Sequence, residues 1–510
     1  MVTVSDAWKA IQKETILPES FIELTYWITE PGAQSLANES NNGTVFYSDH
    51  TAIVDTTNKD FKKYATLENN MWSLDGSFDV LPDKAPYGDT GYVADAEYPT
   101  VTITFPSVRT ELVPGVTIVW SETYGEYATR CRITVLKGTE VVASEEFLNN
   151  SVRSTFNMPI SGYDSIYVEI LDWIVPDHRP RIEGFYLGVR EVYTKSNLIK
   201  YSHTQSVDLL STELPKDQII FSLDNSNDLW NPDNPVGNVR YLMDRQEVSV
   251  KYGYKLPTGV EWIPAGTFWI SEWDTPANGL EATFTARDIL EFLDITYSGP
   301  KSGTLYDIAI AALSQVSLPT TDSGGPRYAV DESLKNISTD FSDDSGSYTA
   351  AVVLQMVANA GQCVMHQTRD GILVIKRYNG KLSDCVIGQD VSYTHPERVM
   401  TKPPLHVNVN NDMWIENLGT TGEPITITNP LISNSTNAKN VAQWASTVLR
   451  SRNLVKGSYR PDPSLDVLDV VSIESKYSKN SKNFVAAITE ITYEYKGTFR
   501  GQYTGREVEV

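Results

Sequence analysis

The chain has 510 residues, a length that predicts about three domains of ordinary size. Hydrophobic residues make up 41% of it and charged residues 21%, as in a typical globular protein. Its 42 basic and 65 acidic side chains give a formal net charge of −23, and such a surface repels nucleic acid, whose binding requires lysine and arginine. No apolar run is long enough for a membrane helix, and the N-terminus carries no secretory signal, so we expect synthesis in the cytoplasm.

The N-terminal residues predict one short helix followed by strands. Residues 5–14 begin with Ser5, a residue type that caps helices, and residues 21–28 alternate between apolar and polar side chains like a strand. Residues 44–47 and 52–54 also have strand character. These pieces are too few to form a domain, so we expect them to join a sheet that is completed later in the sequence.

From about residue 65 the pattern changes to short alternating runs at intervals of roughly 8–12 residues, which predicts an all-β sandwich. The expected strands are residues 100–105, 115–120, 131–136, 165–170 and 182–187.

Residues 217–288 have the clearest period of two. Alternating runs separated by clusters of Pro, Asn, Asp and Gly predict antiparallel strands of a small barrel or meander. The four expected strands are residues 218–223, 247–252, 266–271 and 280–285.

The remaining residues mix helices with strands. We expect helices at 286–293, 304–313, 347–360 and 438–449. The third helix should end at Gly361 as its C-cap, and Asp370-Gly371 predicts a hairpin turn. Further strands are expected at 405–409, 425–428, 470–474 and 484–495. The chain as a whole is therefore predicted to be mainly β with some α (α+β).

Metal and cofactor sites are not expected. Asp224–Asp228 has oxygens at alternate positions like a calcium loop, but Leu229 and Pro235 stand where that loop requires glycine and glutamate, so we expect a hydrogen-bonded turn. None of the six histidines pairs with another at helical spacing. The cysteines are sparse and predict buried free thiols rather than a disulfide framework. They are Cys131, Cys363 and Cys385.

Several segments together resemble the hub proteins at the tip of bacteriophage tails. The first group is Phe-Ser-Leu-Asp-Asn at 221–225, Arg-Gln-Glu-Val-Ser-Val-Lys-Tyr-Gly at 245–253 and Ile-Pro-Ala-Gly-Thr-Phe-Trp-Ile-Ser-Glu-Trp at 263–273. The second group, in the same order as in the family, is 428–432, 457–471 and 493–501. The resemblance implies a homotrimer whose barrels form a closed ring beneath the tail tube.

The predicted sandwich interrupts the hub-like sequence and resembles galactose-binding-like (discoidin or carbohydrate-binding-module type) jelly rolls. This resemblance rests on strand rhythm and on the segments at 72–78 and 181–188. The predicted division is 1–64, N-terminal hub segment; 65–192, inserted β-sandwich; 193–295, hub β-barrel; 296–400, helix-containing α/β domain; and 401–510, second barrel-like domain.

A saccharide site in such a sandwich requires aromatic side chains at loop tips with polar groups nearby. The candidates for contact with a saccharide or a partner are Trp72, Tyr87, Tyr92, Tyr124 and Tyr127, near the carboxylates of Asp75, Asp89, Glu122 and Glu126. The alternative interpretation places Trp72 and Trp120 in the hydrophobic core.

No catalytic motif is evident, so we expect no enzyme activity. The chain has no Gly-x-Ser-x-Gly elbow and no phosphate-binding P-loop. Cys363 and His366 are three residues apart in an expected strand and face opposite sides of the sheet. Carboxylate pairs for glycoside hydrolysis have no distinguishing context. The nominal pairs are Glu122 with Glu126 and Glu169 with Asp172.

The sequence therefore predicts a structural virion protein of a phage tail tip or baseplate. It would cap the tail tube, form a trimeric ring around the DNA path, and take part in host attachment and genome delivery. Expected partners are the tail tube or distal tail protein, the tape-measure protein, other baseplate proteins and host cell-wall glycan. DNA would pass through without sequence-specific binding, although the acidic surface has a simpler explanation in solubility. The alternatives are a carbohydrate-binding adhesin and a glycan-active enzyme with an appended binding module.

Overall fold

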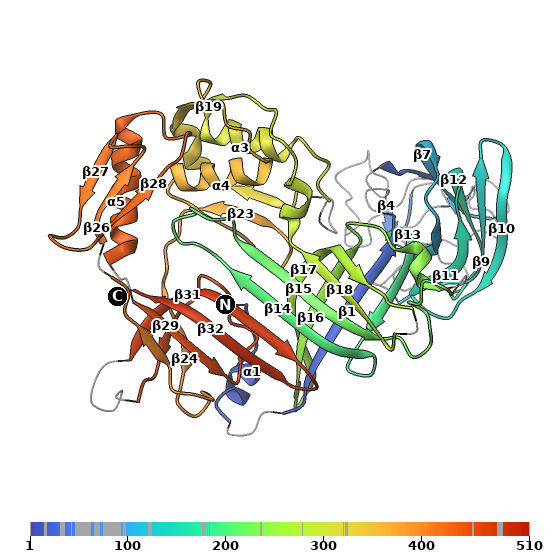
Figure 1. The fold of residues 1–510 in the computed structure, drawn as a ribbon. Helices are drawn as coiled ribbons and strands as arrows, with labels where there is room; N and C mark the ends of the chain where they lie inside the picture. The colour runs from blue at the N-terminus through green and yellow to red at the C-terminus, as the bar shows by residue number, and fades with distance from the viewer. Residues whose placement is uncertain are drawn as a thin grey trace. The chain divides into compact units, whose positions relative to one another are not determined.

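The computed structural model describes most of residues 2–508 (Figure 1). Residues outside the description are 1, 15–17, 31–35, 42, 46–62, 66–71, 75–92, 95–97, 121–124, 176–179, 181, 183, 235–236, 278, 320, 322–324, 403, 451–452, 477–482 and 509–510. Only the backbone is described at 39, 41, 43–45, 63–65, 72–74, 93–94 and 384.

The chain divides into two compact units. The main unit comprises Met1–Tyr26, Val192–Val239 and Glu247–Val510, and the inserted unit comprises Trp27–Glu191 and Arg240–Gln246. The chain thus leaves the main unit inside a strand at Tyr26 and returns to it at Val192. The five-part division predicted from sequence, with its closed barrels, stays a prediction.

The main unit is built on one long sheet in which neighbouring strands are antiparallel. In order across the sheet, its strands are β1 (Ser20–Thr29, through Tyr26), β16 (Glu247–Leu256), β17 (Gly259–Asp274), β18 (Glu281–Arg287), β15 (Lys216–Asp224), β14 (Leu198–Ser206), β31 (Phe484–Tyr495), β32 (Phe499–Glu507), β29 (Leu454–Tyr459) and β25 (Glu397–Val399). Two further strands, β30 (Val470–Ile473) and β24 (Leu382–Ile387), extend from β31.

Two pairings in this sheet join parts of the chain that are far apart in sequence. Strand β1 pairs with β16 from Ser20 to Tyr26, which confirms the prediction that the N-terminal strand joins a sheet completed later. Strand β14 pairs with β31 from Tyr201↔Tyr495 to Ser206↔Glu490. The strands of the two hub-like regions therefore belong to a single sheet.

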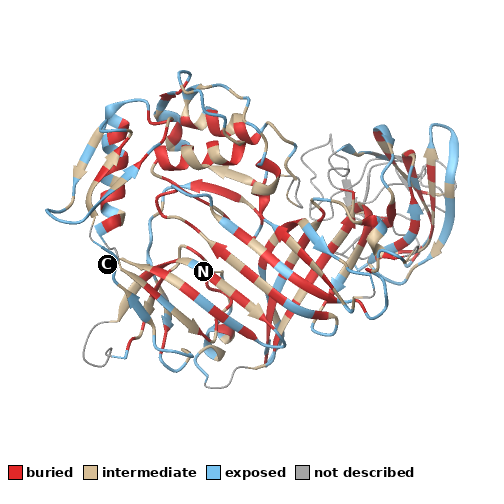
Figure 2. Cartoon of the chain, in the orientation of Figure 1, coloured by how far each residue is buried: buried red, intermediate tan, exposed pale blue. Residues whose placement is uncertain are grey.

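The period-two sequence pattern explains which side of each strand is buried. In β15, Ile219 and Phe221 are fully buried, whereas Ile220 between them is exposed. Figure 2 shows the same alternation of buried and exposed bands along the neighbouring strands. Burial of these apolar side chains stabilises the sheet by about 1.5–3 kcal/mol for each large residue.

The second core of the main unit lies around three helices, α3 (Leu305–Leu313), α4 (Ala350–Ala360) and α5 (Ser435–Arg450). Val407 and Val409 pack into this core, which therefore extends past residue 400. The small strands associated with it are β19 (Ser302–Thr304), β20 (Tyr328–Val330), β21 (Ser338–Asp340), β22 (Val364–Gln367), β23 (Leu373–Lys376), β26 (Pro404–Val409), β27 (Trp414–Asn417) and β28 (Glu423–Ile427). Further described elements of the unit are the 3-10 helices η3 (Ile289–Leu293) and η4 (Glu332–Asn336) and the N-terminal helix α1 (Asp6–Ile11). The 3-10 helix η2 (Asn238–Tyr241) begins in the main unit, and its last two residues belong to the inserted unit.

Four of the five predicted helices form as the α-helices α1, α3, α4 and α5, with one correction at the end of α4, and the fifth differs. Helix α4 ends at Gly361 as expected, but Gly361 has φ −87°, and the left-handed conformation falls on Gln362 with φ +56°. Glycine is required at 361 for space, because a Cβ there would lie 2.2 Å from the Cδ2 of buried Leu334. The stretch predicted as a helix at 286–293 is shorter, a 3-10 turn capped by Asp288.

The inserted unit contains a two-sheet sandwich around a shared hydrophobic core. One sheet has the order β10 (Glu140–Leu148), β9 (Ala128–Lys137), β12 (Tyr163–Trp173), β7 (Thr100–Arg109) and β2 (Asn38–Asn41). The other has the order β11 (Arg153–Ile160), β8 (Val113–Val119) and β13 (Gly184–Tyr193). Two small two-stranded antiparallel sheets are β3 (Gly43–Val45) with β6 (Val93–Ala94) and β4 (Lys63–Ala65) with β5 (Trp72–Leu74).

Three strands of the sandwich were not predicted: β2, whose residues Asn-Glu-Ser-Asn are all polar, β10 and β11. Strand β10 is exposed along nearly its whole length and lacks an apolar alternation. Strand β11 does alternate, with Phe156, Met158 and Ile160 buried, but it contains a proline and an irregular register. The five strands that were predicted all form.

The fold is mainly β with some α, as predicted from the sequence. Among the residues that the structure describes, no helix is long and apolar enough to cross a bilayer.

We expect Gly115→Ala to destabilise the inserted unit. Gly115 lies in β8 with φ +155°, and a Cβ there would lie 2.0 Å from the backbone oxygen of Phe156 in β11. Overpacking of this kind costs about 1–3 kcal/mol or more, because a backbone group cannot turn aside as a side chain does. Thermal unfolding of the full chain measures the effect. The control is Gly419→Ala, whose Cβ would have its nearest neighbour at 3.4 Å, and an equal loss in both variants would contradict the argument.

Candidate functional site

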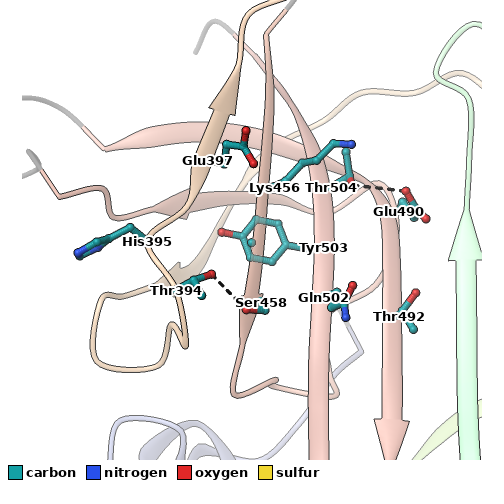
Figure 3. Close-up of a pocket in the computed structure, with 11 residues that line it drawn as sticks. Thr394, His395, Glu397, Lys456, Ser458, Glu490, Thr492, Gln502, Tyr503 and Thr504 are labelled. Atoms are coloured by element: carbon teal, nitrogen blue, oxygen red, sulfur yellow. Dashed lines mark hydrogen bonds between the residues drawn. The ribbon is translucent and has the colours of Figure 1, made fainter.

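An open groove of about 560 Å³ lies on the main unit over β25, β29, β32 and β31 (Figure 3). One cross-strand row crosses it, formed by Glu397, Lys456, Thr504 and Glu490, which are successive register partners on the four strands. These residues occupy the outward positions of strands whose inward side chains are buried. The groove is therefore the polar face of the main sheet.

A second row lies beside the first and continues onto β14. Ser458, Gln502, Thr492 and Thr204 are register partners on β29, β32, β31 and β14. The Oγ1 atoms of Thr204 and Thr492 are 3.3 Å apart. Rows of this kind present hydroxyl, amide and carboxyl groups at the strand spacing of about 4.8 Å.

The groove has the chemistry of a docking surface. Figure 3 shows the Ser458 hydroxyl bonded to Thr394 Oγ1, at 3.2 Å, and the Thr504 hydroxyl directed to Glu490 at 3.4 Å. A serine whose partner is another hydroxyl has no base to activate it as a nucleophile. Two carboxylates with one ammonium suit a polar, hydrogen-bonding partner.

Behind this face, the core of the main unit holds a chain of buried polar groups. Tyr201 Oη lies 2.9 Å from Tyr252 Oη, and the same Tyr252 oxygen lies 2.8 Å from His203 Nδ1. His203 Nε2 lies 2.7 Å from Asp217 Oδ1, and Gln205 Nε2 approaches Asp217 Oδ2 at 3.5 Å. The chain links β14, β16 and the start of β15.

A histidine between a carboxylate and a hydroxyl has the connectivity of a hydrolase triad. Here His203 and Tyr252 have no exposed surface, and the hydroxyl is already bonded to Tyr201. A substrate cannot reach the Tyr252 hydroxyl, so this series of hydrogen-bonded groups has a structural role. Buried polar groups of this kind are stabilising only when each finds a partner.

Arg369 ties a second set of buried groups to the sheet. Its side chain lies in the turn between β22 and β23, and its Nε is 3.2 Å from Asp466 Oδ2. The two Nη atoms donate to the backbone oxygens of Pro463, at 2.5 Å, and Leu465. Tyr493 Oη donates to the same Leu465 oxygen at 2.7 Å. The segment 461–469, part of the hub-like sequence, is thereby held by side chains from β31 and from the hairpin.

Asp288 joins the first of these sets, at Asp217, to the helical core. Its Oδ2 accepts from the Asp217 backbone N–H at 3.0 Å, and its Oδ1 accepts from Leu290 N–H at 3.0 Å. Burial, with the nearby Asp217 carboxylate second, raises the pKa of Asp288 to about 8, and these two hydrogen bonds oppose the rise only in part.

The residues predicted to contact a saccharide are not assembled by the described structure. Tyr87, Tyr92 and Tyr124 lie outside the described residues, and only the backbone of Trp72 is described, in β5. Tyr127 is half-buried and packs against the sandwich core. The proposed site therefore stays a prediction.

The carboxylates considered for catalysis have structural partners where they are described. Glu126 is buried and accepts from Trp173 Nε1 at 3.0 Å, while Glu122 lies outside the described residues. Asp172 pairs with Arg130 at 2.8 Å. Glu169 pairs with Arg132 at 3.2 Å.

The remaining candidates are the Asp224–Asp228 segment and the cysteines. Asp224 Oδ1 accepts from Ser226 N–H, and Asn225 Oδ1 accepts from Trp230 N–H, which confirms the hydrogen-bonded turn. Cys131 and Cys363 are buried free thiols, whereas Cys385 is half-buried. Within the described part of the chain, no group of three or more His, Cys, Asp or Glu side chains has the spacing of a metal site.

Sequence reasoning missed both the groove and the buried chain. Both are assembled from strands that are distant in sequence, so no local motif marks them. The one available signal was the alternation in β31, which placed Glu490 and Thr492 on the outward face.

No family model matches the chain, and no curated protein matches it. Among solved structures, it is similar to the 43 kDa tail protein of prophage MuSo2 from Shewanella oneidensis, with 12% identity and a TM-score of 0.43 over 62% of this chain and 95% of that chain. It is similar to the tail protein from Neisseria meningitidis MC58, with 12% identity and a TM-score of 0.43 over 62% and 94%. A third is the prophage tail protein gp18 from Listeria monocytogenes EGD-e, with 12% identity and a TM-score of 0.39 over 62% and 91%.

We expect Arg369→Met to destabilise the main unit by about 3–5 kcal/mol, because it removes the buried cation paired with Asp466 and the donor to the Pro463 oxygen, and leaves the Leu465 oxygen with Tyr493 alone. Denaturant unfolding of the full chain measures the loss. The matched control is Arg287→Met, which removes the exposed pair with Glu272 and should cost about 0–1 kcal/mol. A similar decrease in the free energy of unfolding in the two variants would show that the buried arrangement stabilises the unit no more than an exposed ion pair does.

Asp288 makes stability depend on pH. The folded state keeps a proton on this carboxyl up to about pH 8, whereas an unfolded aspartate loses it near pH 3.9. Stability from this group is therefore complete below about pH 4 and is lost as pH rises towards 8, by at most about 1.4 kcal/mol per pH unit. In Asp288→Asn this loss should disappear, so melting temperatures of the two proteins should diverge between pH 4 and 8 in favour of the variant. A constant difference across that range would refute the assignment.

Proposed function

We propose that this chain is a structural component of the tip or baseplate of a phage tail, or of a related contractile particle, and acts as its hub. The carrying observation is the junction between its two hub-like regions. The strands of residues 217–288 and those of 457–501 share one sheet through the β14–β31 pairing. Arg369 and Tyr493 hold the segment 461–469 against that sheet. Motifs that resemble one family thus form one physical body.

The proposed assembly is a homotrimer that forms a ring around the DNA path and caps the tail tube. The charge of each chain supports this, since a net −23 repels phosphate and lets DNA pass without binding. The tail tube or distal tail protein, the tape-measure protein and other baseplate proteins would be its partners. The polar groove over β25 to β31 is a suitable surface for one of these contacts, with Glu397 and Glu490 flanking Lys456.

The proposed role is assembly and gating rather than catalysis. The ring would close the tube and open on host contact, and the protein would reside in the virion after synthesis in the host cytoplasm. The groove offers no activated nucleophile, and the histidine with triad-like connectivity is buried. The inserted unit would contact cell-wall glycan or neighbouring baseplate proteins.

We expect the purified chain of 56.9 kDa to form trimers, because a hub completes its ring only with three copies. Native mass spectrometry gives the subunit number, and negative-stain microscopy should show a ring with a central opening. The same measurements in the presence of the tail-tube and tape-measure proteins of the same particle should give a larger complex. A monomer that binds cell-wall saccharides would favour the adhesin instead, and glycan cleavage would favour the enzyme.

A further inference from the structure

Strand β10 is an open edge of the sandwich in the inserted unit. It pairs with β9 from Glu140↔Lys137 to Leu148↔Arg130, and it stands at the end of its sheet among the described residues. Figure 1 labels it at the outer margin of that sheet, and Figure 2 shows it exposed along most of its length. Its second row of backbone groups has no strand beside it in the described part of the chain.

The register identifies which backbone groups face outward. Asn149 N–H donates to the Thr129 oxygen at 2.9 Å, so that pair is a hydrogen-bonded one. In an antiparallel ladder hydrogen-bonded and non-bonded pairs alternate. The residues whose N–H and C=O point away from β9 are therefore Ser144, Glu146 and Leu148. These groups are spaced as the acceptors and donors of one more strand would be.

The edge strand of the other sheet, β11, carries features that prevent pairing with a further strand. Strand β11 ends the other sheet and carries Pro159, with an irregular register between Asn157 and Ile160. Proline and bulges are the usual means of blunting an edge. Strand β10 contains no proline or lysine, and its one irregularity is at Val142, before the outward groups begin.

The side chains of β10 indicate the character of the segment that would pair with it. Val142 and Leu148 are exposed, Leu148 by 84%, and they provide apolar contact. Glu140, Glu145 and Glu146 are exposed acids, and only Glu146 is engaged by arginines of β9. An open hollow of about 430 Å³ begins at the end of β10. Its lining includes Phe147, Arg153 and Phe156.

We propose that β10 is a docking edge that receives an extended segment of another protein, with alternating basic and apolar residues, as an added strand. Only a polypeptide backbone satisfies a row of alternating donors and acceptors at this spacing. Glu140 and Glu145, which lie on one face of the strand and are not the acid paired with the arginines of β9, select basic side chains in that segment. A second copy of β10 fits poorly, because self-pairing would bring those carboxylates together. This inference is independent of the trimeric ring.

The test uses the full chain and an acetylated nine-residue peptide of alternating lysine and valine, labelled at one end. Fluorescence anisotropy gives its affinity, and hydrogen–deuterium exchange reports protection of β10. Ser144→Pro removes an outward N–H and places a ring on the open side while leaving the bonds to β9. Ser144→Ala is the matched control, since both changes remove the hydroxyl bonded to Thr134.

We expect slower exchange in β10 on binding, affinity weakened about tenfold or more by Ser144→Pro, and affinity within about twofold for Ser144→Ala. Glu145→Lys does not alter the backbone hydrogen bonds of the ladder. It should weaken binding of the lysine–valine peptide and strengthen binding of a glutamate–valine peptide. Absence of binding, or equal binding by Ser144→Pro that is still folded, overturns the proposal. If Ser144→Pro does not fold, the charge reversal Glu145→Lys is the deciding variant. Unchanged peptide affinity in that variant overturns the proposal. The native chain could instead associate with itself, and Glu145→Lys could abolish or enhance this self-association without changing peptide affinity. That result would assign the edge to a second copy and also overturn the proposal.

Discussion

The main unit depends on a guanidinium buried among carbonyl oxygens. Residues 461–469 form an irregular segment in which Ser464 and Leu465 are fully buried. A buried segment without regular pairing must satisfy its backbone groups some other way. Arg369 supplies two of these partners, at the Pro463 and Leu465 oxygens, and Tyr254, Tyr378 and Tyr493 supply others. A planar group with five donors suits this task better than an ammonium would.

This arrangement also links the two cores of the main unit. Arg369 belongs to the β22–β23 hairpin, whose Met365 and Leu373 pack into the helical core. Its acceptors belong to the segment that precedes β30 in the long sheet. Gln367 adds a direct link, since its side chain accepts from Ile289 N–H and donates to the Thr267 oxygen. The hairpin is therefore a structural element of both cores.

Much of the fold follows from local patterns. The alternation in residues 218–223 and 484–495 predicts strands because burial on one face imposes a period of two, and β15 and β31 show it. Thr304 begins α3 with a capping box formed with Asp307, as a sequence of this type indicates. The helix and hairpin around Gly361 were likewise predictable, although only the packing of Leu334 explains why that glycine is needed.

Pairing between distant residues could not be predicted in the same way. Arg369 and Asp466 are 97 positions apart, and nothing near either marks the other. Strand β10 lacked a signal for a different reason, since an exposed edge strand has no apolar face to repeat. The candidate saccharide residues were chosen because they were expected in loops. Of these residues, the structure describes the side chain of Tyr127 alone.

The two-part composition of the inserted unit has a practical consequence for grafting. Excising residues 27–191 alone would leave Arg240–Gln246 behind, although that segment belongs to the same compact body. Its Gln246 amide donates to the Thr29 oxygen, and Met243 packs against the sandwich core. A clean transplant of this module to another scaffold must carry both pieces, and a chain trimmed of it needs a substitute for the second.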